Sequence, residues 1–437
     1  RLHHAIAKGR GNYVCLRRLG ATAEDTQEYL PSDDLLPAVD KIKSWAQKTR
    51  DGSKSDLDFT PDNTVWDAVC CEVGNCLNAE CPRFQECFFM RARRQLQNAD
   101  IIVANHALFF SDMAMKMTSD AAGGGILPPY GAVVLDEAHC VEDTAAVHLG
   151  VRISNFGVRR VLQRLFHPGR NRGLLLHDAY TDAREKVAGA HEKSERFFRR
   201  LDEWLSQHDT NPVRYREGGK VPDVLGETLD DVSTVVDKLA RHEEDEGRAQ
   251  ELAALAARVG EFRDGMRAVL DMALPDHVYW FEQFGPGRKG LSMHAVPVQV
   301  GDLLRECLFN RDFSVILTSA TLAVRGNMTY FQKRTGSESA NTLIVSSPFD
   351  FQRQVTLYVP QEMPHPNDTD DFVPAACSYI ERFIQQTEGK AFVLFTSYRM
   401  MQDAADRMGE FFAENNLRLL VQGQGMPRSR MLDAFRS

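Results

Sequence analysis

Two adjacent carboxylates follow a short apolar stretch of the sequence. Residues 132–135 read Ala-Val-Val-Leu, and Asp136 and Glu137 come directly after them. This pattern is typical of a buried strand that ends at the ligand-binding edge of a parallel sheet. There, one carboxylate can hold Mg²⁺ while the other orients the water that attacks a nucleoside triphosphate. We assign the metal ion to Asp136 and the water to Glu137; the alternative is an acidic cap on the following helix.

A second strand-like run is followed by small hydroxyl side chains. Residues 314–317 read Ser-Val-Ile-Leu, and Ser319 and Thr321 come soon after them. Hydroxyl groups at a strand end can hydrogen-bond a neighbouring acidic loop, so we expect these two to convey the state of a bound nucleotide. The alternative is an ordinary turn rich in Ser and Thr.

Five of the nine cysteines lie between Cys70 and Cys87. One dense cluster in a long chain indicates a metal site in a reducing compartment rather than a secreted disulfide scaffold. Cys76, Cys81 and Cys87 are separated by four and five residues and supply three soft ligands. Spacing alone leaves the fourth ligand open between Cys70, Cys71 and a distant cysteine. It also leaves open structural zinc, an iron–sulfur cluster and a set of inert buried thiols.

Basic and aromatic side chains suggest contacts with nucleic acid. Four arginines beside the cysteines can contact the phosphates of a single strand, or else form a solvated helix face: Arg83, Arg91, Arg93 and Arg94. Three consecutive aromatic residues can stack on a base, although core packing is favoured for them: Tyr279, Trp280 and Phe281.

The elements that must position these residues follow from hydrophobic periodicity. Helical patterns at 35–46 and 88–98 flank the cysteines, and amphipathic helices fill residues 154–274. The apolar runs predict strands at 100–106, 132–135, 314–317, 342–345, 355–359, 391–395 and 417–421. Helices at 372–386 and 400–415 alternate with the last strands, and such alternation predicts a parallel sheet.

The composition of the chain limits the classes of protein to which it can belong. The chain has 437 residues, 43% hydrophobic and 26% charged, which is typical of a globular protein of about three domains. Its net charge is −9, so any surface for nucleic acid must be local. Residues 151–200 carry 12 basic and 5 acidic side chains, and residues 201–250 carry 6 basic and 13 acidic ones. The first stretch is either such a surface or a set of solvated helix faces. No apolar run is long enough for a membrane span.

The motifs, in this order, resemble the DinG family of bacterial DNA helicases, which is related to XPD. The resemblance rests on Asn-Tyr-Val-Cys-Leu-Arg-Arg-Leu at 12–19, the cysteine run, Val-Ala-Asn-His-Ala-Leu at 103–108, Asp-Glu-Ala-His at 136–139 and Thr-Ser-Ala-Thr at 318–321. The fourth string is the DEAH box of superfamily 2 helicases, to which His139 belongs, and the last resembles helicase motif III.

The resemblance implies an α/β fold: a RecA-like, parallel-sheet helicase motor that carries two insertions. We expect an iron–sulfur insert at 1–97, the first motor domain at 98–150 and 291–345, a helical arch-like insert at 151–290, and a second motor domain at 346–437. For the 4Fe–4S cluster, the family pattern implies four ligands: Cys15, Cys76, Cys81 and Cys87.

The implied function is ATP-dependent, 5′-to-3′ unwinding of DNA in repair or replication, by a cytoplasmic monomer that uses ATP with Mg²⁺. Its partners would be single-stranded and forked DNA, with no membrane. Ser397 and Tyr398 lie where the family has a motif at the start of the second motor domain, and could meet a phosphate; the alternative is a pair of turn residues.

Two departures from the family pattern matter. No Gly-x-x-x-x-Gly-Lys-Ser/Thr loop occurs in the chain, and the family's last motifs would lie beyond Ser437. We therefore expect an internal fragment that is inactive alone. Two other functions remain open: a non-catalytic nucleic-acid-binding protein with a structural metal site, and the helicase part of a nuclease–helicase.

Overall fold

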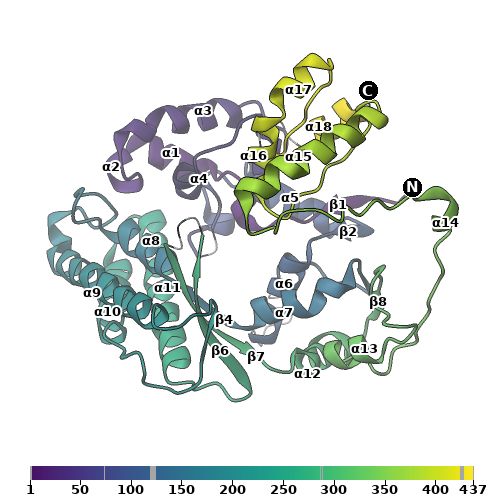
Figure 1. Ribbon diagram of the computed structural model, residues 1–437. Coiled ribbons are helices and arrows are strands. Elements are labelled where there is room, and N and C mark those ends of the chain that lie inside the picture. The colour runs from purple at the N-terminus through teal and green to yellow at the C-terminus, as the bar shows by residue number, and fades with distance from the viewer. Residues whose placement is uncertain are drawn as a thin grey trace. The chain divides into compact units, whose positions relative to one another are not determined.

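The computed structural model describes residues 2–72, 74–118, 125–285, 287, 289–423 and 428–436. The chain divides into two compact units, which are described separately (Figure 1). Unit 1 comprises Arg1–Leu57 and Pro61–Ile344, and unit 2 comprises Asp58–Thr60 and Val345–Ser437.

The N-terminal part of unit 1 is a group of short helices around the cysteine run. They are α1 (Leu16–Glu24), α2 (Thr26–Tyr29), α3 (Leu36–Ala46), α4 (Asn63–Val69) and α5 (Phe88–Gln97). The side chain of Asp62 accepts hydrogen bonds from the amides of Thr64 and Val65, and this cap starts α4. The helices predicted at 35–46 and 88–98 are confirmed as α3 and α5.

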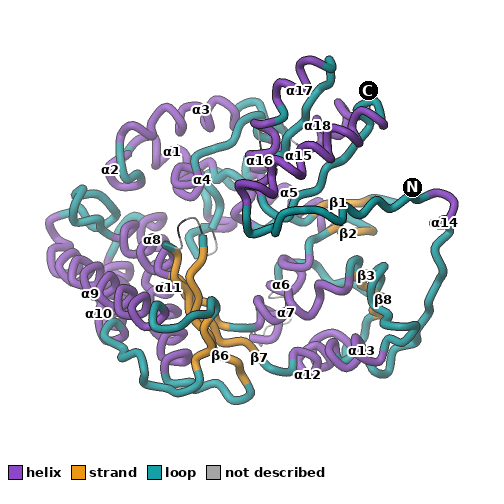
Figure 2. The backbone as a smooth tube through the Cα atoms, viewed as in Figure 1, coloured by secondary structure: helices purple, strands orange, loops and turns teal. Residues whose placement is uncertain are grey.

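Two parallel strand pairs lie in unit 1, and Figure 2 draws them as short orange segments. One pair joins β1 (His4–Ile6) to β2 (Ile101–Val103), and the other joins β3 (Ala132–Leu135) to β8 (Ser314–Leu317). An apolar core packs around them, with helices α6 (His106–Thr118), α7 (Val141–Leu149), α12 (Val300–Leu304) and α13 (Thr329–Thr335). The strands predicted at 132–135 and 314–317 have the predicted bounds.

The segment expected to be a helical arch also contains a sheet. Its helices are α8 (Asn155–Leu165), α9 (Thr181–Leu205), α10 (Gly226–His242) and α11 (Glu246–Leu270). Its antiparallel sheet has the order β4-β7-β6-β5, with β4 (Val151–Ser154), β5 (Val213–Tyr215), β6 (His277–Phe284) and β7 (Gly290–Pro297). The amphipathic helices expected at 154–274 are present, whereas the sheet was not expected, because its strands pair far along the chain and give no helical period.

The two faces of this sheet differ. Tyr279 and Phe281 are 2% and 0% exposed and belong to the core that the arch helices share. Core packing is thus confirmed for these two residues. Side chains alternate along a strand, so Trp280 lies on the opposite face, where it is partly exposed.

Unit 2 is described as helices with a small core. Its helices are α14 (Phe351–Gln354), α15 (Thr369–Gln386), α16 (Tyr398–Arg407), α17 (Gly409–Glu414) and α18 (Arg428–Arg436). Val373, Cys377 and Ile384 of α15 pack against Ala404 of α16 and against Met408. The strands predicted at 342–345, 355–359, 391–395 and 417–421 are not formed in the described residues. A strand needs a hydrogen-bonded neighbour, and these segments have none; side chains such as Leu394 are largely exposed.

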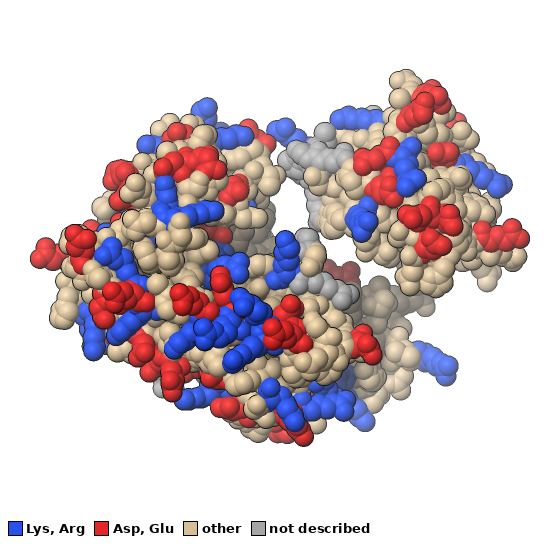
Figure 3. Space-filling view, turned by 60° about the vertical axis from the view of Figure 1, so that its left-hand side comes forward, with Lys and Arg blue, Asp and Glu red and all other residues tan. Residues whose placement is uncertain are grey.

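None of the described helices has both the length and the apolar character to cross a membrane. Figure 3 shows that acidic and basic side chains interleave over much of the visible surface, rather than gathering into one large patch of a single sign.

Candidate functional site

The carboxyl ends of β3 and β8 lie side by side. Leu135 pairs with Leu317, so the chain continues with Asp136 beside Thr318 and Glu137 beside Ser319. Two backbone hydrogen bonds extend the pairing past the strands: the Thr318 amide donates to the Leu135 carbonyl, and the Ala138 amide donates to the Thr318 carbonyl, both at 2.9 Å. The two strand-end motifs are thus held against each other by the backbone.

Their side chains form one hydrogen-bonded group. The hydroxyl of Thr318 donates to Asp136 Oδ1 at 2.8 Å, and that of Ser319 donates to Glu137 Oε2 at 3.3 Å. His139 Nδ1 lies 2.9 Å from Ser319 Oγ and 3.3 Å from Glu137 Oε2. Thr321 Oγ1 lies 3.4 Å from Ser319 Oγ. The structure therefore brings together all five residues that the two motifs contributed to the predicted site.

The two carboxylates remain accessible. The Glu137 side chain is 64% exposed, and in the described residues the bonds to the two carboxylates come from hydroxyls and His139 rather than from Lys or Arg. Glu137 has a left-handed φ of 49°, which turns the chain sharply from β3 into the short helix Ala138–Cys140. Such conformations carry strain and cluster at functional sites. Exposed carboxylates without a fixed cation suit Mg²⁺.

Sequence reasoning missed Thr318 as a member of this group. It stands directly after the β8 run, and its hydroxyl bonds the carboxylate that was assigned to the metal ion. Only the register of β3 against β8 identifies it, because that register decides which hydroxyl faces which acid.

Three cysteines from two segments approach each other. The Cys71 amide donates to the Tyr13 carbonyl and the Cys15 amide donates to the Val69 carbonyl, both at 2.8 Å. The Cys71 thiol lies close to the sulfurs of Cys15 and Cys87. This proximity lowers the pKa of Cys15 and that of Cys87 to about 6, and it raises the pKa of Cys71 itself.

The other cysteines lie differently. Burial raises the pKa of Cys81, and the nearby charges of Cys15 and Cys87 add to this effect. Cys70 turns away from the group, because its thiol faces the Asp67 carbonyl. Cys76 offers its backbone carbonyl to Gln250 at 3.1 Å.

Within the described residues, no group of three or more His, Cys, Asp or Glu side chains forms a ready metal site. The chemistry of the donors nevertheless fits an iron–sulfur cluster, because thiols from two distant segments meet and two of them have lowered pKa values. Cys71, which the family pattern does not use, stands at the centre of this group.

A buried ion network joins the cysteine segment to the arch. Arg164 Nη1 lies 2.8 Å from Glu72 Oε2, and Arg164 Nη2 lies 2.5 Å from Glu251 Oε1. Arg18 contacts both carboxylates at 3.6 Å and donates to the Cys70 carbonyl. Burial alone would raise the pKa of Glu72, but the two guanidinium groups outweigh it and lower that pKa. Side chains from α1, the cysteine loop, α8 and α11 therefore share one electrostatic contact.

The four predicted arginines do not act as one surface. Arg83 forms a 3.0 Å ion pair with Glu86, and Arg93 points to the Gly125 carbonyl at 3.4 Å. Arg91 and Arg94 line one pocket of about 640 Å³. Two further basic side chains in its wall were missed by the sequence analysis: Lys8 and Arg50.

Ser397 and Tyr398 begin α16 in unit 2. The Ser397 hydroxyl accepts a hydrogen bond from the Met400 amide at 3.1 Å, which is a helix cap. The Tyr398 hydroxyl accepts one from Gln422 at 3.1 Å. Both residues thus have local structural partners, as the turn alternative expected.

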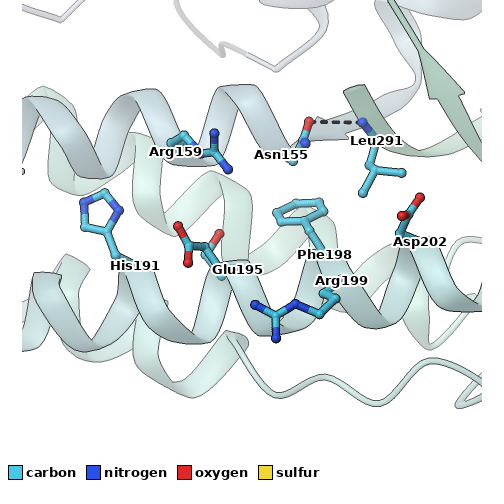
Figure 4. A pocket seen from close by; sticks show the side chains of 9 residues that line it. Asn155, Arg159, His191, Glu195, Phe198, Arg199, Asp202 and Leu291 are labelled. Carbon is cyan, nitrogen blue, oxygen red and sulfur yellow. Dashed lines mark hydrogen bonds between the residues drawn. The ribbon is translucent and has the colours of Figure 1, made fainter. Parts of the chain in front are cut away.

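A pocket of about 260 Å³ lies between α8 and α9 (Figure 4). Arg159, His191 and Glu195 are among the residues that line it. Asn155 accepts a hydrogen bond from the Leu291 amide and donates to the Lys289 carbonyl, so its amide is used within the protein. The mixed charge of the wall favours no class of ligand.

The known proteins to which this chain is similar carry helicase and exonuclease names. A model of the family described as DEAD_2 matches residues 64–157. ATP-dependent DNA helicase YoaA from Escherichia coli is 30% identical, over 99% of this chain and 64% of its own length. ATP-dependent DNA helicase DinG from Photobacterium profundum is 27% identical, over 96% and 65%. The 3′-5′ exonuclease DinG from Bacillus subtilis is 22% identical, over 99% and 50%.

The parallel strands, with the acid–hydroxyl group after the carboxyl ends of β3 and β8, give a mixed α/β fold of the kind found in RecA-like helicase cores. The chain is similar to helicases named YoaA and DinG, in line with the resemblance seen in the sequence. The chain spans less than two thirds of the length of each of these relatives.

Proposed function

We propose that this chain is part of an ATP-dependent DNA helicase that unwinds DNA with 5′-to-3′ polarity in repair or replication. The observation that carries the proposal is the group formed by Asp136, Glu137, Thr318 and Ser319 at one strand edge. Asp136 holds Mg²⁺ of the bound ATP, and Glu137 orients the attacking water. The hydroxyls of Thr318 and Ser319, which follow β8, report the loss of the γ-phosphate to the rest of the motor. The protein works in the cytoplasm as a monomer.

The proposal includes a 4Fe–4S cluster held by Cys15, Cys76, Cys81 and Cys87. A cluster bound by both segments would clamp the start of the insert to its end, because the cross-link closes a long loop of chain. The contact of Cys15 with the cysteine run supports this assignment. Cys71 competes with Cys76 for one ligand position, since its thiol lies close to the sulfurs of Cys15 and Cys87.

Single strands of forked DNA are the proposed substrate, bound by phosphate contacts along the pocket of Arg91 and Arg94. Its other basic side chains, Lys8 and Arg50, support a phosphate-binding role.

The experiment that tests the proposal measures ATP turnover by a full-length protein containing this chain. Glu137→Gln should still bind ATP and should lose DNA-stimulated turnover by about a hundredfold or more, because the water loses its orienting base. Unchanged turnover would refute the role of Glu137. Residues 1–437 alone contain no Gly-x-x-x-x-Gly-Lys-Ser/Thr loop, so we expect no turnover from them above the Glu137→Gln control.

The exonuclease name of the Bacillus subtilis relative supports a second candidate function, which is the helicase part of a nuclease–helicase. DNA degradation by the full-length protein, retained in Glu137→Gln, would favour it.

A further inference from the structure

One face of the arch sheet carries a row of side chains that nothing above explains. In the strand order β4-β7-β6-β5, Arg152 pairs with His294, His294 with Trp280, and Trp280 with Arg214. The four residues therefore form one line across four strands. Three strand spacings make this line about 14 Å long.

The middle of the row is a pair of stacked rings. The centroids of Trp280 and His294 lie 4.7 Å apart with an angle of 5° between the planes. The imidazole ring of His294 is held by two hydrogen-bonding partners, since its Nε2 lies 2.8 Å from Ser292 Oγ and 3.1 Å from Glu282 Oε1. Ser292 also donates to Glu282 at 3.1 Å, so the acid is used in holding the histidine.

The ends of the row are cationic and open to solvent. Arg152 and Arg214 are exposed, whereas Trp280 is partly exposed. The guanidinium of Arg152 lies 5.4 Å from the ring of Phe284 on the same face. One face of the Trp280 indole is covered by His294, so its other face is turned toward β5, the strand of Arg214.

We propose that this row is a stacking platform for single-stranded DNA, with a base against Trp280 and phosphates at Arg152 and Arg214. The proposal rests on the proposed function, and it adds a binding site on the arch insert. A partly exposed aromatic ring in a row that ends in two arginines matches a strand that alternates flat bases with negative phosphates. Charge complementarity favours a nucleic acid over a protein partner here, because the row carries two arginines and the carboxylate of Glu282 is already bonded to His294 and Ser292.

The test is binding of a labelled oligothymidylate by the full-length protein. Trp280→Ala should weaken binding about tenfold, and Trp280→Phe should retain most of it, because a phenyl ring still stacks. Trp45→Ala is the matched control, since it removes a partly exposed tryptophan outside the row and should leave affinity unchanged. Tryptophan fluorescence should be quenched by the oligonucleotide in the wild type and less so in Trp280→Phe.

Arginine variants provide a second test of the platform, which stays valid even if a tryptophan variant does not fold. Arg152→Gln with Arg214→Gln should reduce the slope of log affinity against log salt by about 1.4, which is two phosphate contacts at about 0.7 each. Wild-type binding that neither the Trp280 nor the arginine changes alter would overturn the platform and leave the proposed function standing. A wild-type protein that does not bind the oligonucleotide would overturn both.

Discussion

At the scale of single residues, the site consists of two carboxylates, each of which accepts a hydrogen bond from one hydroxyl. Asp136 and Glu137 carry the charge that Mg²⁺ and an attacking water require, and Thr318 and Ser319 each donate to one of these carboxylates. Donation to a carboxylate fixes the direction of its lone pairs, which is the role expected of residues that position a metal ligand. Thr318 is thus a positioning residue for Asp136.

Replacing Thr318 tests that role. Thr318→Ala should lower DNA-stimulated ATP turnover about tenfold, because a hydrogen bond to a charged group contributes about 1.5 kcal/mol at the lower end of its range. Thr318→Ser keeps the hydroxyl and should restore most of the turnover. The Mg²⁺ concentration for half-maximal turnover should rise in Thr318→Ala and return in Thr318→Ser. If alanine and serine variants behave alike, the hydroxyl does not position Asp136.

The choice of cluster ligands among the cysteines is also tested by single substitutions. Cys15→Ser should lose the iron and the visible absorbance of the anaerobically purified protein, whereas Cys70→Ser should keep both, because the Cys70 thiol faces away. Comparing the iron content of Cys71→Ser with that of Cys76→Ser shows which of these two cysteines completes the ligand set. We expect Cys76→Ser to lose the cluster and Cys71→Ser to keep it. The reverse result would assign the position to Cys71, and zinc in the wild type would remove the cluster.

At the scale of elements, the cysteine segment and the arch are joined by buried charge. Glu251 of α11 is 2% exposed and serves both Arg18 and Arg164. Removing Glu251 leaves two guanidinium groups against the single carboxylate of Glu72, and an undercompensated buried charge costs more than the pair contributes. The arch helices and the cysteine loop should therefore unfold together.

Glu251→Ala should lower the free energy of unfolding by about 3 kcal/mol, measured by urea denaturation. Glu261→Ala is the matched control on the same helix, because Glu261 is exposed and pairs only with the exposed Arg258; its cost should be below about 1 kcal/mol. Equal costs for the two variants would show that the network adds nothing to an ordinary surface pair.

Local sequence patterns predict some elements and miss others for a physical reason. The β3 and β8 runs are short and apolar, and the acids and hydroxyls after them could be placed at one sheet edge without a structure. The sequence alone does not identify Thr318 and Cys71 as site residues. Their partners depend on the strand register and on which distant segments lie close together in the fold. Strand alternation separates Trp280 from Tyr279 and Phe281, and this distinction requires the pairing of β6 to be known.

At the scale of the whole molecule, the proposed helicase function requires that DNA be held during ATP turnover. We expect Arg91→Glu with Arg94→Glu to weaken binding of a single strand by more than tenfold and to reduce the salt slope by about 1.4, since both side chains line one basic pocket. Arg83→Glu serves as the control, because Arg83 is already paired with Glu86. An unchanged slope in the double variant would make these arginines a solvated helix face.

The most direct test of the central claim is strand separation by a full-length protein that contains this chain. Forked duplexes with a single-stranded 5′ or 3′ arm should be offered with ATP and Mg²⁺, beside the Glu137→Gln variant. The account predicts unwinding that needs ATP, starts from the 5′ arm and disappears in Glu137→Gln. Binding of DNA without ATP-dependent unwinding would instead identify a non-catalytic nucleic-acid-binding protein and contradict the account.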